Sequence, residues 1–112
     1  MKTKIKICGL KTPQDISFAN RLHPDYIGFI FVPESRRFVE VNTALTLRRE
    51  LDPEIRSVGV FVNAPVETVL SLADQALFSL IQLHGQENEA YVQKLKASCD
   101  LPVIKAFSVS SS

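Results

Sequence analysis

Short apolar runs alternate with longer amphipathic stretches along this chain, and the alternation predicts its elements. Five apolar runs are typical of strands, at residues 4–8, 26–32, 57–62, 78–84 and 102–107. Between them, four stretches carry apolar residues at helical spacing, over residues 12–22, 42–51, 63–76 and 88–98. Regular alternation of strands and helices with short connections predicts a parallel sheet with right-handed crossovers.

The expected helix starts carry recognisable capping residues. Thr12 is placed to cap the first helix, with Pro13 at the first helical position and Asp15 in the turn that favours anions. Asn63 is expected to cap the third helix in the same way. Leu22 completes the apolar stripe of the first helix.

Several strands pair an aliphatic face with a face that turns polar toward its carboxyl end. Lys6 and Cys8 share one face of the first strand, and Gln82 and His84 share one face of the fourth. Lys105, between aliphatic neighbours, extends the pattern to the fifth strand. A closed barrel whose interior opens into a site produces this pattern. An open doubly wound sheet would bury these groups at a cost of a few kcal/mol each unless they were paired.

The predicted fold class is therefore α/β, with parallel βα units forming part of a TIM (βα)8 barrel. The part amounts to (βα)4 plus a fifth strand, over residues 1–112 as one domain. A flavodoxin-like open sheet is the less favoured alternative. It would require the polar strand residues to be paired or solvated beside helices, and no motif for a flavin or nucleotide accompanies it.

Composition narrows the function classes. Of 112 residues, 46% are hydrophobic and 22% charged, which is typical of a soluble globular protein. Thirteen basic against twelve acidic side chains give no field that attracts nucleic acid or a membrane. The start has no signal-peptide pattern, and Cys8 and Cys99 have no metal-ligand spacing, so we expect a reduced, cytoplasmic protein without a metal. Cys99 is expected to be structural.

The carboxyl ends of the strands hold the candidate site residues, because that edge is the functional edge of parallel βα folds. Cys8 is a nucleophile or base candidate beside a same-face lysine, although a free cysteine is often only a small buried hydrophobe. Arg36 and Arg37 follow the second strand and suit an anionic group, although they could be a solvated loop pair. His84 could equally be a hydrogen-bonded interior histidine.

Together, these features resemble the phosphoribosylanthranilate isomerase family of tryptophan biosynthesis. The resemblance covers the whole chain. It rests on residues 6–9, 28–31 running into 35–38, 58–63, 81–85 and 103–107.

The resemblance implies a cofactor-free Amadori rearrangement of N-(5-phosphoribosyl)anthranilate to 1-(2-carboxyphenylamino)-1-deoxyribulose 5-phosphate. By position, Cys8 matches the family's general base, which removes the C2 proton of the ring-opened imine. Arg37 matches the arginine that meets the anthranilate portion. Gln82 and His84 match residues that bind the substrate. The implied partner is thus a small phosphorylated substrate, with no cofactor and no metal.

The resemblance also implies that some catalytic and binding groups of the family lie outside these 112 residues. It places the general acid, an aspartate after a sixth strand, and the phosphate-binding loops beyond Ser112, so we expect a truncated and inactive chain. The alternative is an assembly module, a half-barrel whose open strand edges self-associate or pair with a complementary fragment.

Overall fold

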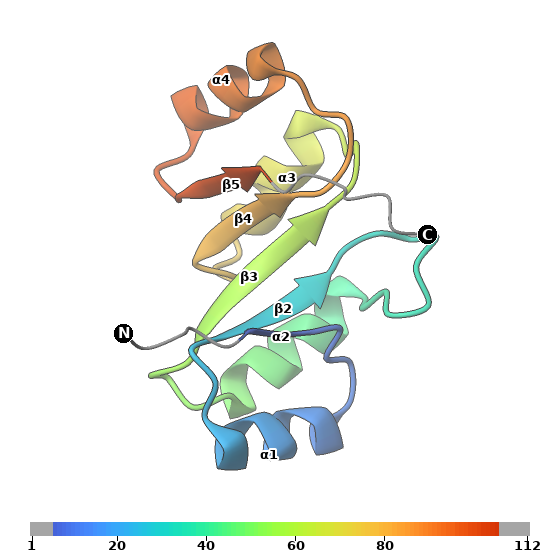
Figure 1. Ribbon diagram of the computed structural model, residues 1–112, viewed down its shortest axis with the longest axis vertical. Coiled ribbons are helices and arrows are strands. Elements are labelled where there is room, and N and C mark those ends of the chain that lie inside the picture. Colours follow the sequence, from blue (N-terminus) through green and yellow to red (C-terminus); the bar gives the residue numbers. More distant parts are fainter. Residues whose placement is uncertain (1–5, 106–112) are drawn as a thin grey trace.

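The computed structural model describes residues 6–105 and folds them into alternating strands and helices (Figure 1). The strands are β1 (Lys6–Cys8), β2 (Tyr26–Ile30), β3 (Arg56–Phe61), β4 (Leu80–Leu83) and β5 (Val103–Lys105). The helices are α1 (Pro13–Leu22), α2 (Val41–Glu50), α3 (Val66–Ala73) and α4 (Glu89–Ser98). Each expected element is present; α2 and β3 keep their expected lengths but begin and end one residue earlier, and the others are shorter than expected. The parts of the first and fifth strands expected at residues 4–5 and 106–107 lie outside the described residues.

The five strands form one parallel sheet in the order β1-β2-β3-β4-β5. A doubly wound sheet reverses its strand order at a switch point, whereas successive strands of a barrel always lie side by side. The order therefore confirms the barrel arc and excludes the flavodoxin-like alternative. Figure 1 shows α1 and α2 beside the β1–β2 end of the sheet and α3 and α4 beside the β4–β5 end.

The strand register separates two faces of the sheet. On one face, apolar side chains pack into a continuous core with the helices, where Ile27, Phe29, Phe61, Ile81 and Leu83 are fully buried. The opposite face carries the rows Cys8–Gly28–Val58–Leu80 and Ile30–Val60–Gln82–Ile104. Ile104 is 45% exposed on this second face. The aliphatic layer thus lies against the helices, and the mixed layer is left open for a site.

The start of α1 confirms the expected cap. Thr12 Oγ1 accepts a hydrogen bond from the Asp15 amide at 3.1 Å, and Asp15 Oδ2 accepts one from the Thr12 amide at 3.1 Å. Asp15 Oδ2 also accepts from the Lys11 amide, and this bond is the main reason that the pKa of Asp15 lies below its usual value. This reciprocal capping box begins the helix that follows β1.

Replacing Thr12 by alanine is expected to lower the free energy of unfolding by about 1 kcal/mol, because the cap acceptor is lost. The measurement is urea denaturation followed by circular dichroism. Thr43→Ala is the control, since Thr43 is exposed on α2 and makes no cap. Equal effects of the two substitutions would contradict the capping role.

Three sequence predictions about the helices are wrong. Leu22, the last residue of α1, is 54% exposed and so lies outside the core that Ile16 and Ala19 enter. Ala76 lies beyond the end of α3, in a left-handed turn with φ 57°. Asn63 does not cap α3: the cap position is Pro65, and Asn63 itself adopts a left-handed conformation with φ 50°. Within the described residues, no helix is long and apolar enough to cross a membrane.

Candidate functional site

A cavity of about 510 Å³ opens on the second face of the sheet, toward the carboxyl ends of the strands. All four candidate site residues line it: Cys8, Arg37, Gln82 and His84. Cys8 and Gln82 are half-buried, whereas Arg37 and His84 are exposed. Aliphatic side chains of Ile30, Val60 and Val62 form the rest of its wall. A mostly apolar cavity of this size with a few convergent polar groups is the usual form of a small-molecule site.

The electrostatics of the cavity favour an anion. Arg36 and Arg37 both contribute to the lining, and no carboxylate does among the residues that the structure describes. A guanidinium can bind a carboxylate through two parallel hydrogen bonds. The arrangement is therefore chemically suited to a small molecule that carries a carboxylate.

Local hydrogen bonds fix the loop that carries the two arginines. Ser35 Oγ accepts from the Arg37 amide at 3.1 Å, and the Arg36 carbonyl accepts from Lys11 Nζ at 2.6 Å. Phe38 then returns to pair with Ile30 in a parallel bridge. The loop is thus tied both to β2 and to the loop that directly follows Cys8, the last residue of β1.

Lys6, on the same face of β1 as Cys8, makes its side-chain contact with Gln82. Its ammonium donates a hydrogen bond to Gln82 Oε1, so the side chain reaches across the open face from β1 to β4. This contact orients the Gln82 amide within the cavity wall. It also links the first and fourth strands on the face that carries the site.

The prediction that Lys105 belongs to this polar face is wrong. Lys105 is in register with Leu83 on the helix-facing side, while Ile104 is the neighbour of Gln82. Its ammonium contacts Glu87 Oε1 at 2.9 Å and donates to the Gly85 carbonyl. Pairing removes the cost of placing this lysine beside the core.

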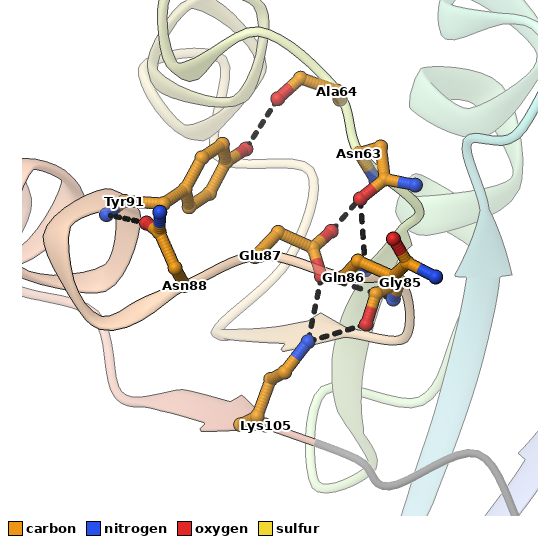
Figure 2. Close-up of polar contacts among 8 residues, drawn as sticks. All are labelled: Asn63, Ala64, Gly85, Gln86, Glu87, Asn88, Tyr91 and Lys105. Atoms are coloured by element: carbon orange, nitrogen blue, oxygen red, sulfur yellow. Dashed lines mark hydrogen bonds and ion pairs between the residues drawn. The ribbon is translucent and has the colours of Figure 1, made fainter.

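Glu87 is the centre of a polar network that the sequence did not reveal (Figure 2). Its side chain is only 1% exposed, and its two oxygens accept hydrogen bonds from the amides of Asn63, at 2.7 Å, and Gly85, at 2.9 Å. Asn63 Oδ1 accepts in turn from the Gln86 amide at 2.8 Å. Figure 2 shows how these contacts join the segments that follow β3 and β4 to Lys105 of β5.

Two opposing effects set the pKa of Glu87. Burial raises the pKa, but hydrogen bonds from Lys105, from the Asn63 amide and from other backbone amides together hold it below its usual value of 4.5. Nearby, burial raises the pKa of Tyr91, whose hydroxyl donates to the Ala64 carbonyl at 2.5 Å. Glu87 is thus a carboxylate at neutral pH and fastens the loops around the site.

One group of potential metal ligands lies elsewhere. His23 Nε2 is 3.4 Å from Asp52 Oδ2 and 3.4 Å from Glu54 Oε1, at the amino ends of β2 and β3. His23 and Glu54 are exposed, and the group takes no part in the cavity. We interpret it as a surface ion-pair cluster.

Fold and site together define a class of protein: a barrel-type βα protein with a thiol and an arginine at the carboxyl edge of its sheet. Comparison with known proteins then identifies the family. The sequence model described as N-(5'phosphoribosyl)anthranilate (PRA) isomerase matches residues 5–112. The chain belongs to this family.

Individual curated relatives of this chain carry the same isomerase name. The chain is 46% identical over 106 residues to N-(5'-phosphoribosyl)anthranilate isomerase from Endomicrobium trichonymphae, a match that covers 95% of this chain and 52% of the relative. It is 48% identical over 93 residues to the isomerase from Thermoanaerobacter sp. (strain X514), covering 83% of this chain and 45% of that one. The chain therefore spans about half the length of the curated relatives it matches.

Solved structures give the same result for the fold. Phosphoribosyl anthranilate isomerase from Thermus thermophilus superposes with a TM-score of 0.87 at 34% identity, covering 96% of this chain and 53% of that chain. Another isomerase structure, in complex with reduced 1-(o-carboxyphenylamino)-1-deoxyribulose 5-phosphate, gives a TM-score of 0.85 at 34% identity. It covers 93% of this chain and 53% of that chain.

Proposed function

We propose that this chain is the thiol-bearing half of an N-(5'-phosphoribosyl)anthranilate isomerase acting in tryptophan biosynthesis. The observation that carries the proposal is the cavity that brings together Cys8, Arg37, Gln82 and His84 in a chain of this family. The ligand of one related structure, an aryl carboxylate on a sugar phosphate, has the chemistry that an arginine-lined cavity suits.

In the proposed mechanism, Cys8 as thiolate takes the proton from C2 of the ring-opened imine. The imine is N-protonated after ring opening: the electrons of the C–H bond form a C1–C2 double bond, and those of the C=N bond return to nitrogen, which keeps its proton as an amine N–H. The enaminol then gains a proton at C1 and loses its hydroxyl proton, which gives the ketone. Arg37 holds the anthranilate carboxylate, and Gln82 and His84 bind the rest of the substrate.

The proposal assigns the remaining groups to sequence that this chain does not contain. A complete barrel has eight strands, and the described residues form five. The general acid and the phosphate site would come from the other half. A base thiol must also stay reduced, which supports a cytoplasmic location as part of the proposal; both cysteines are free.

The test is to join residues 1–112 to the carboxyl-terminal half of the Endomicrobium trichonymphae relative and to assay isomerisation. The fusion is expected to turn over, and the isolated chain is expected not to. Turnover by the isolated chain, or none by a folded fusion, would contradict the proposal.

A second candidate function is self-association of the half-barrel. The observation that favours it is the open face, where Ile104 is 45% exposed, together with the edge positions of β1 and β5 in the described sheet. Unpaired strand edges readily pair with another chain. Sedimentation at micromolar concentration should show a dimer, and a well-folded monomer would exclude this function.

A further inference from the structure

Two glycines lie directly beside the side chains of the proposed site. Cys8, the proposed base, contacts Gly28, and Arg37, the proposed carboxylate-binding arginine, contacts Gly9. Gly28 on β2 is in register with Cys8 on β1, and a Cβ atom at position 28 would lie 2.9 Å from Cys8 Sγ. The thiol therefore leans over the bare Cα of Gly28, toward the strands that line the cavity. Any larger residue at position 28 would occupy the space of the sulfur.

Gly9 provides a similar notch for Arg37. A Cβ atom at position 9 would lie 2.4 Å from Arg37 Cδ and 3.1 Å from Arg37 Cγ, so the aliphatic stem of the arginine crosses directly over this glycine. Gly9 also has φ 86°, a conformation that other residues adopt only with strain. The residue next to Cys8 in the chain thus supports the arginine that shares its cavity.

We propose that Gly28 and Gly9 are positioning residues, which hold the Cys8 thiol and the Arg37 guanidinium together in the cavity. This inference rests on the proposed function for the roles of Cys8 and Arg37. In the presence of a Cβ at position 28, the sulfur rotates away from β2 toward the edge of the sheet, and so away from the cavity. A Cβ at position 9 lifts the arginine stem.

The other contacts of Gly28 predict that its substitution costs little stability. The hypothetical Cβ is 3.5 Å from both the Cα and the Cβ of Cys8, which is ordinary contact, so only the mobile sulfur has to move. Gly59 offers the opposite case and a matched control. Its Cβ would lie 2.6 Å from the ring of Phe78, which is 4% exposed in the core on the helix side. Gly59→Ala should therefore destabilise the fold without reaching the thiol.

The experiment measures alkylation of Cys8 in the 112-residue chain at low salt, in a Cys99→Ser background that leaves a single thiol. Rate constants are compared for iodoacetate, which is anionic, and iodoacetamide, which is neutral. Both reagents attack the same thiolate, so their ratio cancels exposure and thiolate fraction and reports a cation close to the sulfur.

Gly28→Ala is expected to lower the iodoacetate-to-iodoacetamide ratio about threefold, because it moves the thiol away from the guanidinium, and Arg37→Gln should lower the ratio by a similar factor, because it removes the guanidinium. Gly59→Ala should leave the ratio unchanged while lowering the urea midpoint. If the Gly9→Ala variant folds, it should lower the ratio as Arg37→Gln does. If it does not fold, the ratios of Gly28→Ala and Arg37→Gln alone test the inference. An unchanged ratio in folded Gly28→Ala or in Arg37→Gln overturns the inference.

In the fusion with the carboxyl-terminal half, Gly28→Ala should mainly lower kcat, because it moves the base. Gly9→Ala should mainly raise KM, because it moves the carboxylate-binding arginine. The alkylation ratio is measured without turnover. A folded but inactive fusion would therefore contradict the proposed function but not the positioning role of the two glycines. Equal changes of kcat and KM in Gly28→Ala, Gly9→Ala and the control Gly59→Ala would contradict the inference.

Discussion

Glu87→Ala is expected to lower the free energy of unfolding by about 1–3 kcal/mol, the usual cost of leaving hydrogen-bond donors without their acceptor. Without the carboxylate, whose side chain is only 1% exposed, the Lys105 ammonium and the amides of Asn63 and Gly85 lose their shared acceptor. Small domains have only about 5–15 kcal/mol of stability, so this single change should remove a sizeable part of it. Urea denaturation followed by circular dichroism measures the loss.

The matched control is Glu34→Ala, because Glu34 is an exposed glutamate in the loop after β2. Its loss should change the unfolding free energy by less than about 0.5 kcal/mol. Equal urea midpoints for Glu87→Ala and Glu34→Ala would contradict the structural role of the Glu87 network.

The same carboxylate predicts how stability depends on pH. Because the folded state holds the pKa of Glu87 below its usual 4.5, the folded state favours the ionised form. Its contribution is fully present above about pH 4.5 and is lost as the pH falls through the folded pKa. Glu87→Gln should flatten this acid slope, and Asp15→Asn should remove a further part, since the pKa of Asp15 is lowered as well. An acid slope that Glu87→Gln leaves intact would contradict the prediction.

The fold was largely predictable because its signals are local. Apolar runs mark the strands, and the Thr12–Asp15 box marks the start of α1 independently of any distant contact. Element ends were less certain, since tertiary packing decides where pairing stops. Asn63 shows why: its side chain has the chemistry of a cap, but the Gln86 amide, 23 residues away in sequence, is the donor it binds.

The candidate site was predictable to the extent that strand ends and alternation determine it. Cys8, Arg37, Gln82 and His84 share one cavity because the carboxyl ends of parallel strands meet at one edge. Lys105 was misplaced because alternation tells which residues share a face of one strand, but the register with β4 decides which face that is. Glu87 carried no signal, since a glutamate in a polar loop usually points to solvent.

The second large effect concerns the thiol itself. In the fusion of residues 1–112 with the carboxyl-terminal half of the Endomicrobium trichonymphae relative, Cys8→Ser should lower kcat by about 10²–10⁴-fold, the usual contribution of a positioned general base. A serine hydroxyl has nearly the size of the thiol but stays protonated at neutral pH. The fold and the cavity should therefore survive the substitution.

The control for that substitution is Cys99→Ser. Cys99 lies at the end of α4, outside the cavity, and packs against the core. It is a second free thiol of the same chain, so its loss tests whether any cysteine change harms the enzyme. Cys99→Ser should retain a kcat within about twofold of the parent fusion, because no site contact is removed.

The most direct test of the account is thus one set of turnover measurements on the parent fusion, its Cys8→Ser variant and its Cys99→Ser variant. We expect turnover by the parent, a loss of at least about a hundredfold with Cys8→Ser, and near-parent rates with Cys99→Ser. Folded Cys8→Ser protein that turns over as fast as the parent would contradict the assignment of Cys8 as the base.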